Sequence, residues 1–228
     1  MQMPSCREPP PKKPLPNGRY NLSQPIPINL AFEDDLSEEV LRKLLLSSER
    51  PYQIGHCFPA RGYGYLKKHI CGFNKAAKGM PYLVLTDLDN AECAPEMMRK
   101  WLQPSKHPNL LFRIAVREVE AWLLGDRVGI ANFLCISPDL VPADVDMIDD
   151  PKRSLIELAK RSRKRTIRED LVPRRGSTAK QGSGYNDRLI SFVRTRWDHS
   201  AAKENSPSLE RTVRALETFV PIWEDRRG

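Results

Sequence analysis

The chain lacks the features that mark membrane, secreted and zinc-binding proteins. No apolar run approaches the roughly 18 residues that a membrane-spanning helix needs, and the N-terminus has no charged-then-apolar signal pattern. The five cysteines are scattered without a CxxC pair, and the four histidines form no HxH or HExxH arrangement, which argues against a disulfide framework or a zinc site. We therefore expect a cytoplasmic protein with a core of normal size.

One segment carries a large excess of basic over acidic residues. The 228 residues carry 37 Lys and Arg against 29 Asp and Glu, a net charge of +8. The stretch 152–180 holds eleven bases and three acids, which accounts for the whole excess. Such a run can neutralise nucleic-acid phosphates, although it is also typical of a solvated helix face, and it contains no aromatic residue for base stacking. The candidate nucleic-acid contacts are Arg161, Arg163, Lys164, Arg165, Arg174 and Arg175.

Proline and charge divide the chain into three regions. Eight of the 20 prolines lie in the first 27 residues, and proline lacks the backbone donor that regular structure needs. We expect residues 1–25 to form a disordered tail, either a docking segment for a proline-binding module or a flexible leader. Residues 26–150 are expected to form an α/β domain, and residues 151–228 a basic, helical region packed on it.

Apolar runs alternate with helical periodicity from about residue 26 to residue 135. Strands are expected at 28–32, 52–58, 82–86 and 110–116, of which 82–86 is the clearest buried one, and helices at 36–46, 63–73, 97–102, 119–124 and 130–134. Asp35 and Glu38 have capping-box spacing at the start of the first helix. This order predicts a largely parallel, Rossmann-like sheet with helices on both faces. Later segments are expected to be helical, at 154–163, 185–197 and 209–219.

Acidic residues follow three of the predicted strands. Glu33 follows the first, Asp87 and Asp89 follow the third, and Glu118 and Glu120 follow the fourth. Ligands of open α/β sheets bind at the carboxyl ends of the strands. If these three strands are neighbours, five carboxylates converge on one edge of the sheet.

The Asp87-Leu88-Asp89 triplet is the sharpest of these groups. In an extended chain, residues two apart point to the same side, and two adjacent carboxylates suit a hard cation such as Mg²⁺, which usually needs only one or two of them. The alternative is a strand-to-helix turn in which Asp89 or Asn90 caps the next helix.

The other acids have ordinary interpretations beside the functional one. Glu33 can simply favour the dipole of the helix that follows. Glu118 or Glu120 can pair with Arg113 or Arg117 near the surface. Both glutamates have apolar neighbours, among them Val119 and Trp122. An acid in such surroundings can equally be buried and functional, and the sequence leaves both interpretations open.

Together these residues resemble a known catalytic domain. A strand ending in Glu33, a helix carrying Glu38 and a strand ending in Asp87-Leu88-Asp89 resemble the Toprim domain of topoisomerases, primases and overcoming-lysogenization-defect (OLD) nucleases. The stretches 117–124 and 150–152 are similar to stand-alone Toprim-like proteins found near bacterial defence loci. The resemblance covers about residues 26–155 and implies a Toprim-like fold, with a possible role and partner protein in anti-phage defence.

The resemblance also implies roles for single residues. Glu33 would be the general acid/base, or a metal ligand as in nucleases, and Asp87 and Asp89 would hold Mg²⁺ or Mn²⁺. Lys152 would neutralise a phosphate in the transition state. The further candidate metal ligands are Glu38, Glu118 and Glu120.

One position departs from the family pattern. Many members place a glycine directly after the first glutamate and a second acid four residues on, where this chain has Asp34 and Ser37 ahead of Glu38. The turn is altered or one residue longer.

Three functions follow from these observations. The first is a Mg²⁺-dependent nuclease acting on DNA or RNA phosphodiesters, because such cleavage needs metal-bound oxygens, a base and phosphate-binding cations. The second is a Toprim-like module that binds nucleic acid or a protein without cleaving. The third, more remote, is a phosphohydrolase of the haloacid-dehalogenase type with Asp87 as nucleophile.

Overall fold

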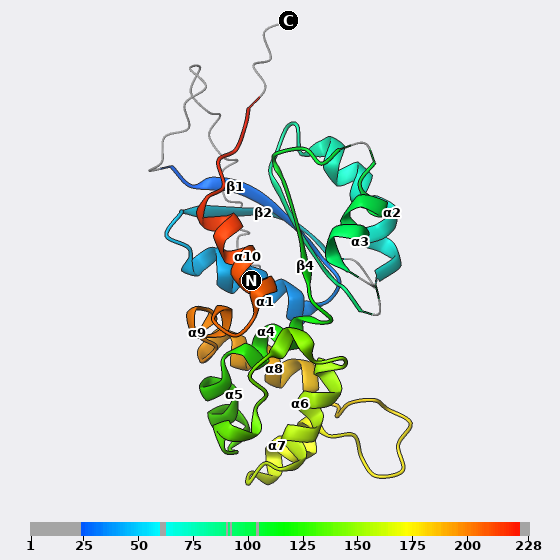
Figure 1. The fold of residues 1–228 in the computed structure, drawn as a ribbon, viewed down its shortest axis with the longest axis vertical. Coiled ribbons are helices and arrows are strands. Elements are labelled where there is room, and N and C mark those ends of the chain that lie inside the picture. The colour runs from blue at the N-terminus through cyan, green and yellow to red at the C-terminus, as the bar shows by residue number, and fades with distance from the viewer. Residues whose placement is uncertain (1–23, 60–62, 90, 92, 104, 224–228) are drawn as a thin grey trace, which may run out of the picture.

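A four-stranded, all-parallel sheet forms the centre of the upper half of the molecule (Figure 1). The structure is a computed structural model and describes residues 24–59, 63–89, 91, 93–103 and 105–223. The strands lie in the order β2-β1-β3-β4, and they span β1 (Ile26–Phe32), β2 (Tyr52–Pro59), β3 (Tyr82–Asp87) and β4 (Leu110–Ala115). The expected proline-rich tail falls almost entirely outside the described residues.

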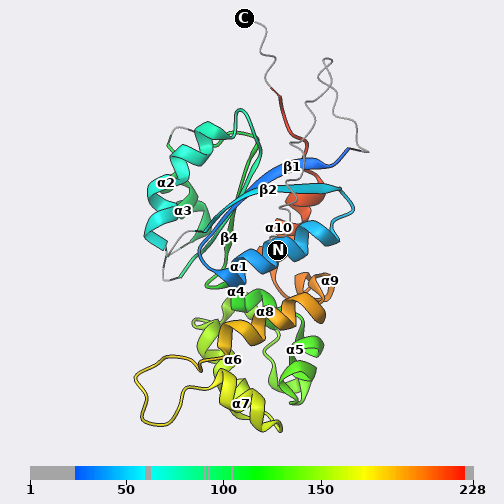
Figure 2. The ribbon, with the colours of Figure 1, turned by 180° about the vertical axis from the view of Figure 1, so that it is seen from behind.

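Helices cover both faces of this sheet, as the sequence predicts. Alternate side chains of β1 and β3, such as Leu30 and Leu83, pack into one apolar cluster with helix α1 (Asp35–Ser47). Val84 of β3 points to the other face and packs with α2 (Tyr63–Ala76) and α3 (Ala94–Trp101). Figures 1 and 2 show α1 and the pair α2–α3 on opposite sides of the strands. Strands buried on two faces explain the continuous apolar runs in the sequence.

In the described part of the chain only helices follow β4, and most of them form the lower half of the molecule, whereas the last helix lies beside the sheet (Figure 2). They are α4 (Val119–Gly125), α5 (Arg127–Leu134), α6 (Pro151–Lys160), α7 (Arg165–Leu171), α8 (Tyr185–Thr195), α9 (His199–Lys203) and α10 (Pro207–Glu217), with short 3₁₀ turns at Pro138–Leu140 and Val145–Met147. α8 packs on α1 and α10 packs along β4. Both join the α1 side of the sheet in one continuous apolar cluster.

Buried polar contacts fasten the C-terminal helices to this core. The Trp122 indole is fully buried and donates to Ser208 Oγ over 2.7 Å. Asn109 exchanges two hydrogen bonds with the backbone of Ile222, at 2.6 and 2.8 Å, and so ties the last described segment to the start of β4. The helical region is therefore packed on the sheet, while the boundary at residue 150 remains a prediction.

The first helix begins one residue away from its expected cap. Asp34 is the N-cap of α1, and its carboxylate accepts from the Ser37 amide over 2.8 Å. The Asp35–Glu38 capping box is wrong, because Asp35 already lies in the first turn. The short helices α7 and α9 were not expected either.

No single helix in the described part of the chain is long and apolar enough to cross a membrane. Two consecutive segments, Arg127–Leu134 and Pro138–Met147, reach the required length and hydropathy only when joined, and they are bent by 111°.

Candidate carboxylate site at the sheet edge

The order in which the chain adds strands to the sheet reverses between β1 and β3. From β1 it crosses through α1 to β2 on one side, and from β2 it crosses through α2 to β3 on the other side. Connections that leave neighbouring strands in opposite directions open a crevice at the carboxyl edge, where open α/β sheets bind their ligands. Glu33 and Asp87 stand at the ends of these two strands, so the topology places both acids at the crevice.

Glu33 is joined directly to the end of β3. Its Oε1 accepts a short hydrogen bond from the Thr86 hydroxyl and a second one, at 3.3 Å, from the amide of Asp87. Burial raises the pKa of Glu33, and these two hydrogen bonds oppose the rise. The half-buried carboxyl is thus held in a fixed position beside Asp87.

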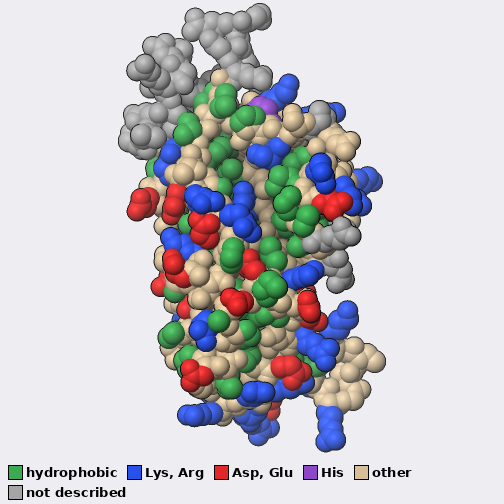
Figure 3. Space-filling model, viewed as in Figure 1, with side chains coloured by type: hydrophobic (Ala, Val, Ile, Leu, Met, Phe, Trp, Pro, Cys, Tyr) green, Lys and Arg blue, Asp and Glu red, His purple; other side chains and the backbone are tan. Residues whose placement is uncertain are grey.

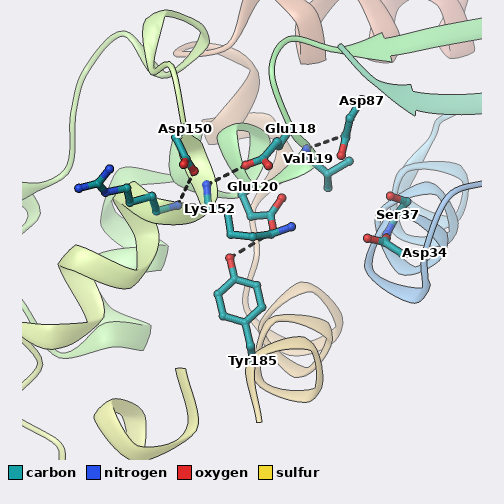
Figure 4. Close-up of polar contacts among 10 residues, drawn as sticks. Asp34, Ser37, Asp87, Glu118, Val119, Glu120, Asp150, Lys152 and Tyr185 are labelled. Atoms are coloured by element: carbon teal, nitrogen blue, oxygen red, sulfur yellow. Dashed lines mark hydrogen bonds and ion pairs between the residues drawn. The ribbon is translucent and has the colours of Figure 1, made fainter. Parts of the chain in front are cut away.

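Asp87 connects β3 to the start of α4. Its Oδ1 accepts from the Val119 amide over 3.0 Å, at the N-terminus of that helix (Figure 4). Burial raises the pKa of Asp87 well above its ordinary value of 3.8, and the negative charges of Glu120 and Glu33 raise it further. The negative charges around Asp87 are thus not balanced by nearby positive charge.

The loop after β3 has a strained backbone. Asp89 has φ +48° and Arg117, in the loop after β4, has φ +63°. Both conformations are uncommon for non-glycine residues, and the two loops are joined by a 2.9 Å bond from the Asp89 amide to the Arg117 carbonyl. β3 ends at Asp87, so the extended alternation expected to align Asp87 with Asp89 does not continue to Asp89. That residue is exposed, and it does not cap α3, whose N-cap is Cys93.

Lys152 brings the two remaining acids together. Its Nζ lies 3.4 Å from Oε1 of Glu120, and its amide donates to Glu118 Oε2 over 2.9 Å. Tyr185 donates its hydroxyl proton to the same Glu120 oxygen over 3.2 Å (Figure 4). Neither glutamate pairs with Arg113 or Arg117 as the surface interpretation expected.

Electrostatically, Lys152 is outnumbered by its acidic neighbours. Burial raises the pKa of Glu120 to about 7 against the opposing charge of Lys152, burial also raises the pKa of Glu118, and partial desolvation of the carboxyl raises the pKa of Asp89. Burial alone would lower the pKa of Lys152, but Glu120 and Glu118 outweigh it, and the pKa is raised. We use the name carboxylate cluster for Glu33, Asp87, Asp89, Glu118 and Glu120.

The carboxylate cluster offers a metal ion only carboxylate oxygens, and these are ligands that Mg²⁺ and Mn²⁺ prefer. Its surplus of negative charge also favours a cation. In the part of the chain that the structure describes, however, no three Asp, Glu, His or Cys side chains lie close enough together to hold a metal ion between them. The residues therefore fit a cation in chemistry and charge, and the structure does not show a complete ligand set.

The other predicted site residues lie outside the carboxylate cluster. Glu38 forms a 2.7 Å ion pair with Arg42 on its own helix. The six basic candidates are all exposed, on the segment after α6, on α7 and in the loop 172–184 that follows it. Arg165 pairs with Glu169 at 2.7 Å, whereas within the described residues the other five pair with no carboxylate: Arg161, Arg163, Lys164, Arg174 and Arg175.

Two contributors to the site were missed from the sequence. Thr86 is 1% exposed and sits beside Asp87 in β3, so a buried hydroxyl next to the acidic triplet was a usable signal. Tyr185 lies 65 residues from Glu120, and nothing in its own segment points to that contact.

The raised pKa of Glu120 predicts how stability depends on pH. The folded protein keeps this proton up to about pH 7, whereas the unfolded chain releases it near 4.5, so the free energy of unfolding falls as pH rises through that interval. The loss from this group is about 3 kcal/mol. Glu120→Gln should flatten the decline, measured by urea unfolding from pH 5 to pH 8, and the exposed control Glu49→Gln should not. Equal slopes in all three proteins would contradict the assignment.

In comparisons with protein-family models, with curated proteins and with solved structures, nothing matches this chain.

Proposed function

We propose that this chain is a Toprim-like, Mg²⁺-dependent nuclease that cleaves phosphodiester bonds of DNA or RNA in the cytoplasm. The observation that carries the proposal is the placement of Glu33 and Asp87 at the ends of neighbouring strands, on either side of the point where the chain reverses across the sheet. That arrangement puts the half-buried acid Glu33 beside a candidate metal ligand at the edge where such sheets bind ligands.

Asp87 and Asp89 are the residues we propose to hold the divalent cation. Mg²⁺ commonly takes one or two carboxylates and completes its shell with water and phosphate oxygens, so a full ring of protein ligands is not required. The cation would supply a Lewis acid for the phosphate oxygens. Glu33, with its raised pKa, would accept or return a proton at its free oxygen.

Lys152 is proposed to contact the phosphate from the part of the carboxylate cluster formed by Glu118 and Glu120. Glu118 and Glu120 hold it through its backbone amide and its ammonium group. Its side chain is 34% exposed, and we propose that the ammonium group contacts a phosphate while it balances the buried Glu120. In this account the two glutamates position the lysine.

The basic residues beyond α6 are proposed to hold the nucleic acid. Figure 3 shows Lys and Arg side chains gathered at the lower end of the molecule, around α7 and the loop 172–184. Cations that pair with no carboxylate are free to release counterions from a phosphate backbone, which gives sequence-independent, salt-sensitive affinity.

Cleavage of supercoiled plasmid tests the proposal. We expect the purified protein to convert plasmid to open circles in the presence of Mg²⁺ and to be inactive with EDTA. Glu33→Gln should lower the rate by about 10²-fold, because it removes the proton acceptor and keeps the hydrogen-bonding oxygen. A single-stranded RNA substrate assayed in parallel distinguishes the two nucleic acids. Equal activity of wild type and Glu33→Gln would overturn the role of Glu33.

A second candidate is a module that binds nucleic acid without cleaving it. It is favoured by Glu38, which pairs with Arg42 outside the carboxylate cluster and leaves the family's second acidic position unmatched at the site. A salt-dependent shift of DNA, with no turnover at any Mg²⁺ or Mn²⁺ concentration, would select this function.

A further inference from the structure

A cavity lined by several basic side chains opens at the opposite edge of the sheet from the carboxylate cluster. It has a volume of about 540 Å³ and lies between the C-terminal end of α2 and the segment that leads from α3 into β4. Six of its lining residues carry the argument, and they are Cys71, Asn74, Lys75, Lys78, Lys106 and His107. Because they precede β3 and β4, they stand at the amino edge of these parallel strands.

This amino-edge cavity contains basic groups without acidic ones. Its described lining includes three lysines and a histidine and no Asp or Glu. The sequence has no acid at all between Glu49 and Asp87. By contrast, a cavity of about 680 Å³ beside α7 is lined by Glu169 and Asp170 as well as by bases. Of these two cavities, the amino-edge cavity is therefore the one whose uniformly basic lining favours an anion.

Two of the three lysines of this cavity, Lys75 and Lys78, are not needed to complete the fold. The carbonyls of Phe73, Lys75 and Ala76 at the end of α2 already accept from backbone amides of the turn that follows. Lys75 and Lys78 are exposed, and in the described part of the chain they pair with no carboxylate. Their ammonium groups are thus available to a ligand.

The remaining donors are held in place. Asn74 accepts from the His107 amide over 2.7 Å and so fixes the segment before β4 to α2. The Asn109 amide donates to Nδ1 of His107 over 3.1 Å, so the neutral ring carries its proton on Nε2. Lys106 uses one of its three donors on the Leu110 carbonyl, at 2.8 Å. Burial and the nearby Arg113 lower the pKa of Lys106, and a bound anion would reverse that effect.

We propose that the amino-edge cavity binds a small molecule bearing a polyphosphate group. Three ammonium groups and a ring N–H around one hollow match the several oxygens and charges of a di- or triphosphate. The volume lies within the range of small-ligand sites, and a concave hollow suits a compact anion better than an extended backbone. The site is independent of the proposed cleavage chemistry, which lies at the other edge of the sheet.

Inorganic tripolyphosphate, titrated by calorimetry into the full chain in metal-free buffer, tests the proposal. The double substitution Lys75→Gln/Lys78→Gln should weaken binding by about 10-fold or more, because it removes two charged hydrogen-bond donors. The matched control Lys67→Gln/Lys68→Gln removes the same charge from α2 outside the cavity and should bind as wild type does. Bound tripolyphosphate should also slow alkylation of Cys71 and leave the exposed Cys93 unchanged.

Absence of tripolyphosphate binding would overturn the site, and so would equal weakening of binding in both double variants. A third contradicting result is loss of duplex DNA affinity in Lys75→Gln/Lys78→Gln together with absence of tripolyphosphate binding. The last would show contact with a nucleic-acid backbone. Plasmid cleavage by the same variant separates this proposal from the proposed function, since we expect the Mg²⁺-dependent rate to remain at the wild-type level whether or not the cavity binds its ligand.

Discussion

Asp87→Asn is expected to lower Mg²⁺-dependent plasmid cleavage by about 10³-fold, because a neutral amide is a poor ligand for a hard cation and several kcal/mol of transition-state stabilisation depend on the metal. The fold should survive, since asparagine keeps an oxygen that can accept from the Val119 amide. The same substitution should abolish any rise in melting temperature that Mg²⁺ produces in the wild type.

Stability and activity must be measured together for this variant. Removing the Asp87 charge also relieves its repulsion with Glu120 and Glu33, so we expect the metal-free variant to be at least as stable as the wild type. The exposed Glu49→Gln serves as the control for loss of one acid. Cleavage by Asp87→Asn at the wild-type rate, in a correctly folded protein, would rule out Asp87 as a metal ligand.

Lys152→Met is expected to destabilise the protein in a pH-dependent way. Without Lys152, the buried Glu120, which is 4% exposed, loses its cationic partner. At pH 8 the loss should be about 2 kcal/mol, less than for a fully buried pair because the Lys152 side chain is partly exposed. At pH 5 Glu120 is protonated in the folded state, so the loss should nearly disappear. Urea unfolding at the two pH values measures both.

The double variant Lys152→Met/Glu120→Gln separates structure from chemistry. It should recover most of the stability lost at pH 8, since no buried charge remains unpaired, yet it should not recover plasmid cleavage if the Lys152 ammonium group contacts the phosphate. The neighbouring exposed Arg153→Met is the control for loss of a cation on α6. An equal loss of stability at pH 5 and pH 8 in Lys152→Met would contradict the ion-pair account.

The parallel sheet could be predicted because three of its four strands, β1, β3 and β4, are largely buried, whereas the edge strand β2 has no buried residue. Tyr82–Asp87 and its neighbours are short apolar runs, bounded by turn residues and separated by amphipathic helices, and that order leaves few topologies. The helices Arg165–Leu171 and His199–Lys203 could not be predicted, because each spans less than two turns and its place depends on tertiary packing.

The candidate site could be predicted only in part. Its position follows from the rule that ligands bind at the carboxyl ends of strands, and the structure does bring Glu33 next to Asp87. The partners of Glu120 could not be foreseen, since Lys152 and Tyr185 come from helices far along the chain. The backbone of the Asp87-Leu88-Asp89 triplet also differs from the expected extended conformation. Asp89 has a left-handed conformation, which breaks the alternation that the sequence suggested.

Binding of Mn²⁺, followed by electron paramagnetic resonance at pH 8, tests the central claim most directly. The carboxylate cluster should hold the ion in the wild type, so the signal of free Mn²⁺ should fall as protein is added. Asp87→Asn should leave that signal unchanged, and Glu49→Gln should behave as the wild type. Absence of binding by the wild type, or equal binding by Asp87→Asn, would contradict the account.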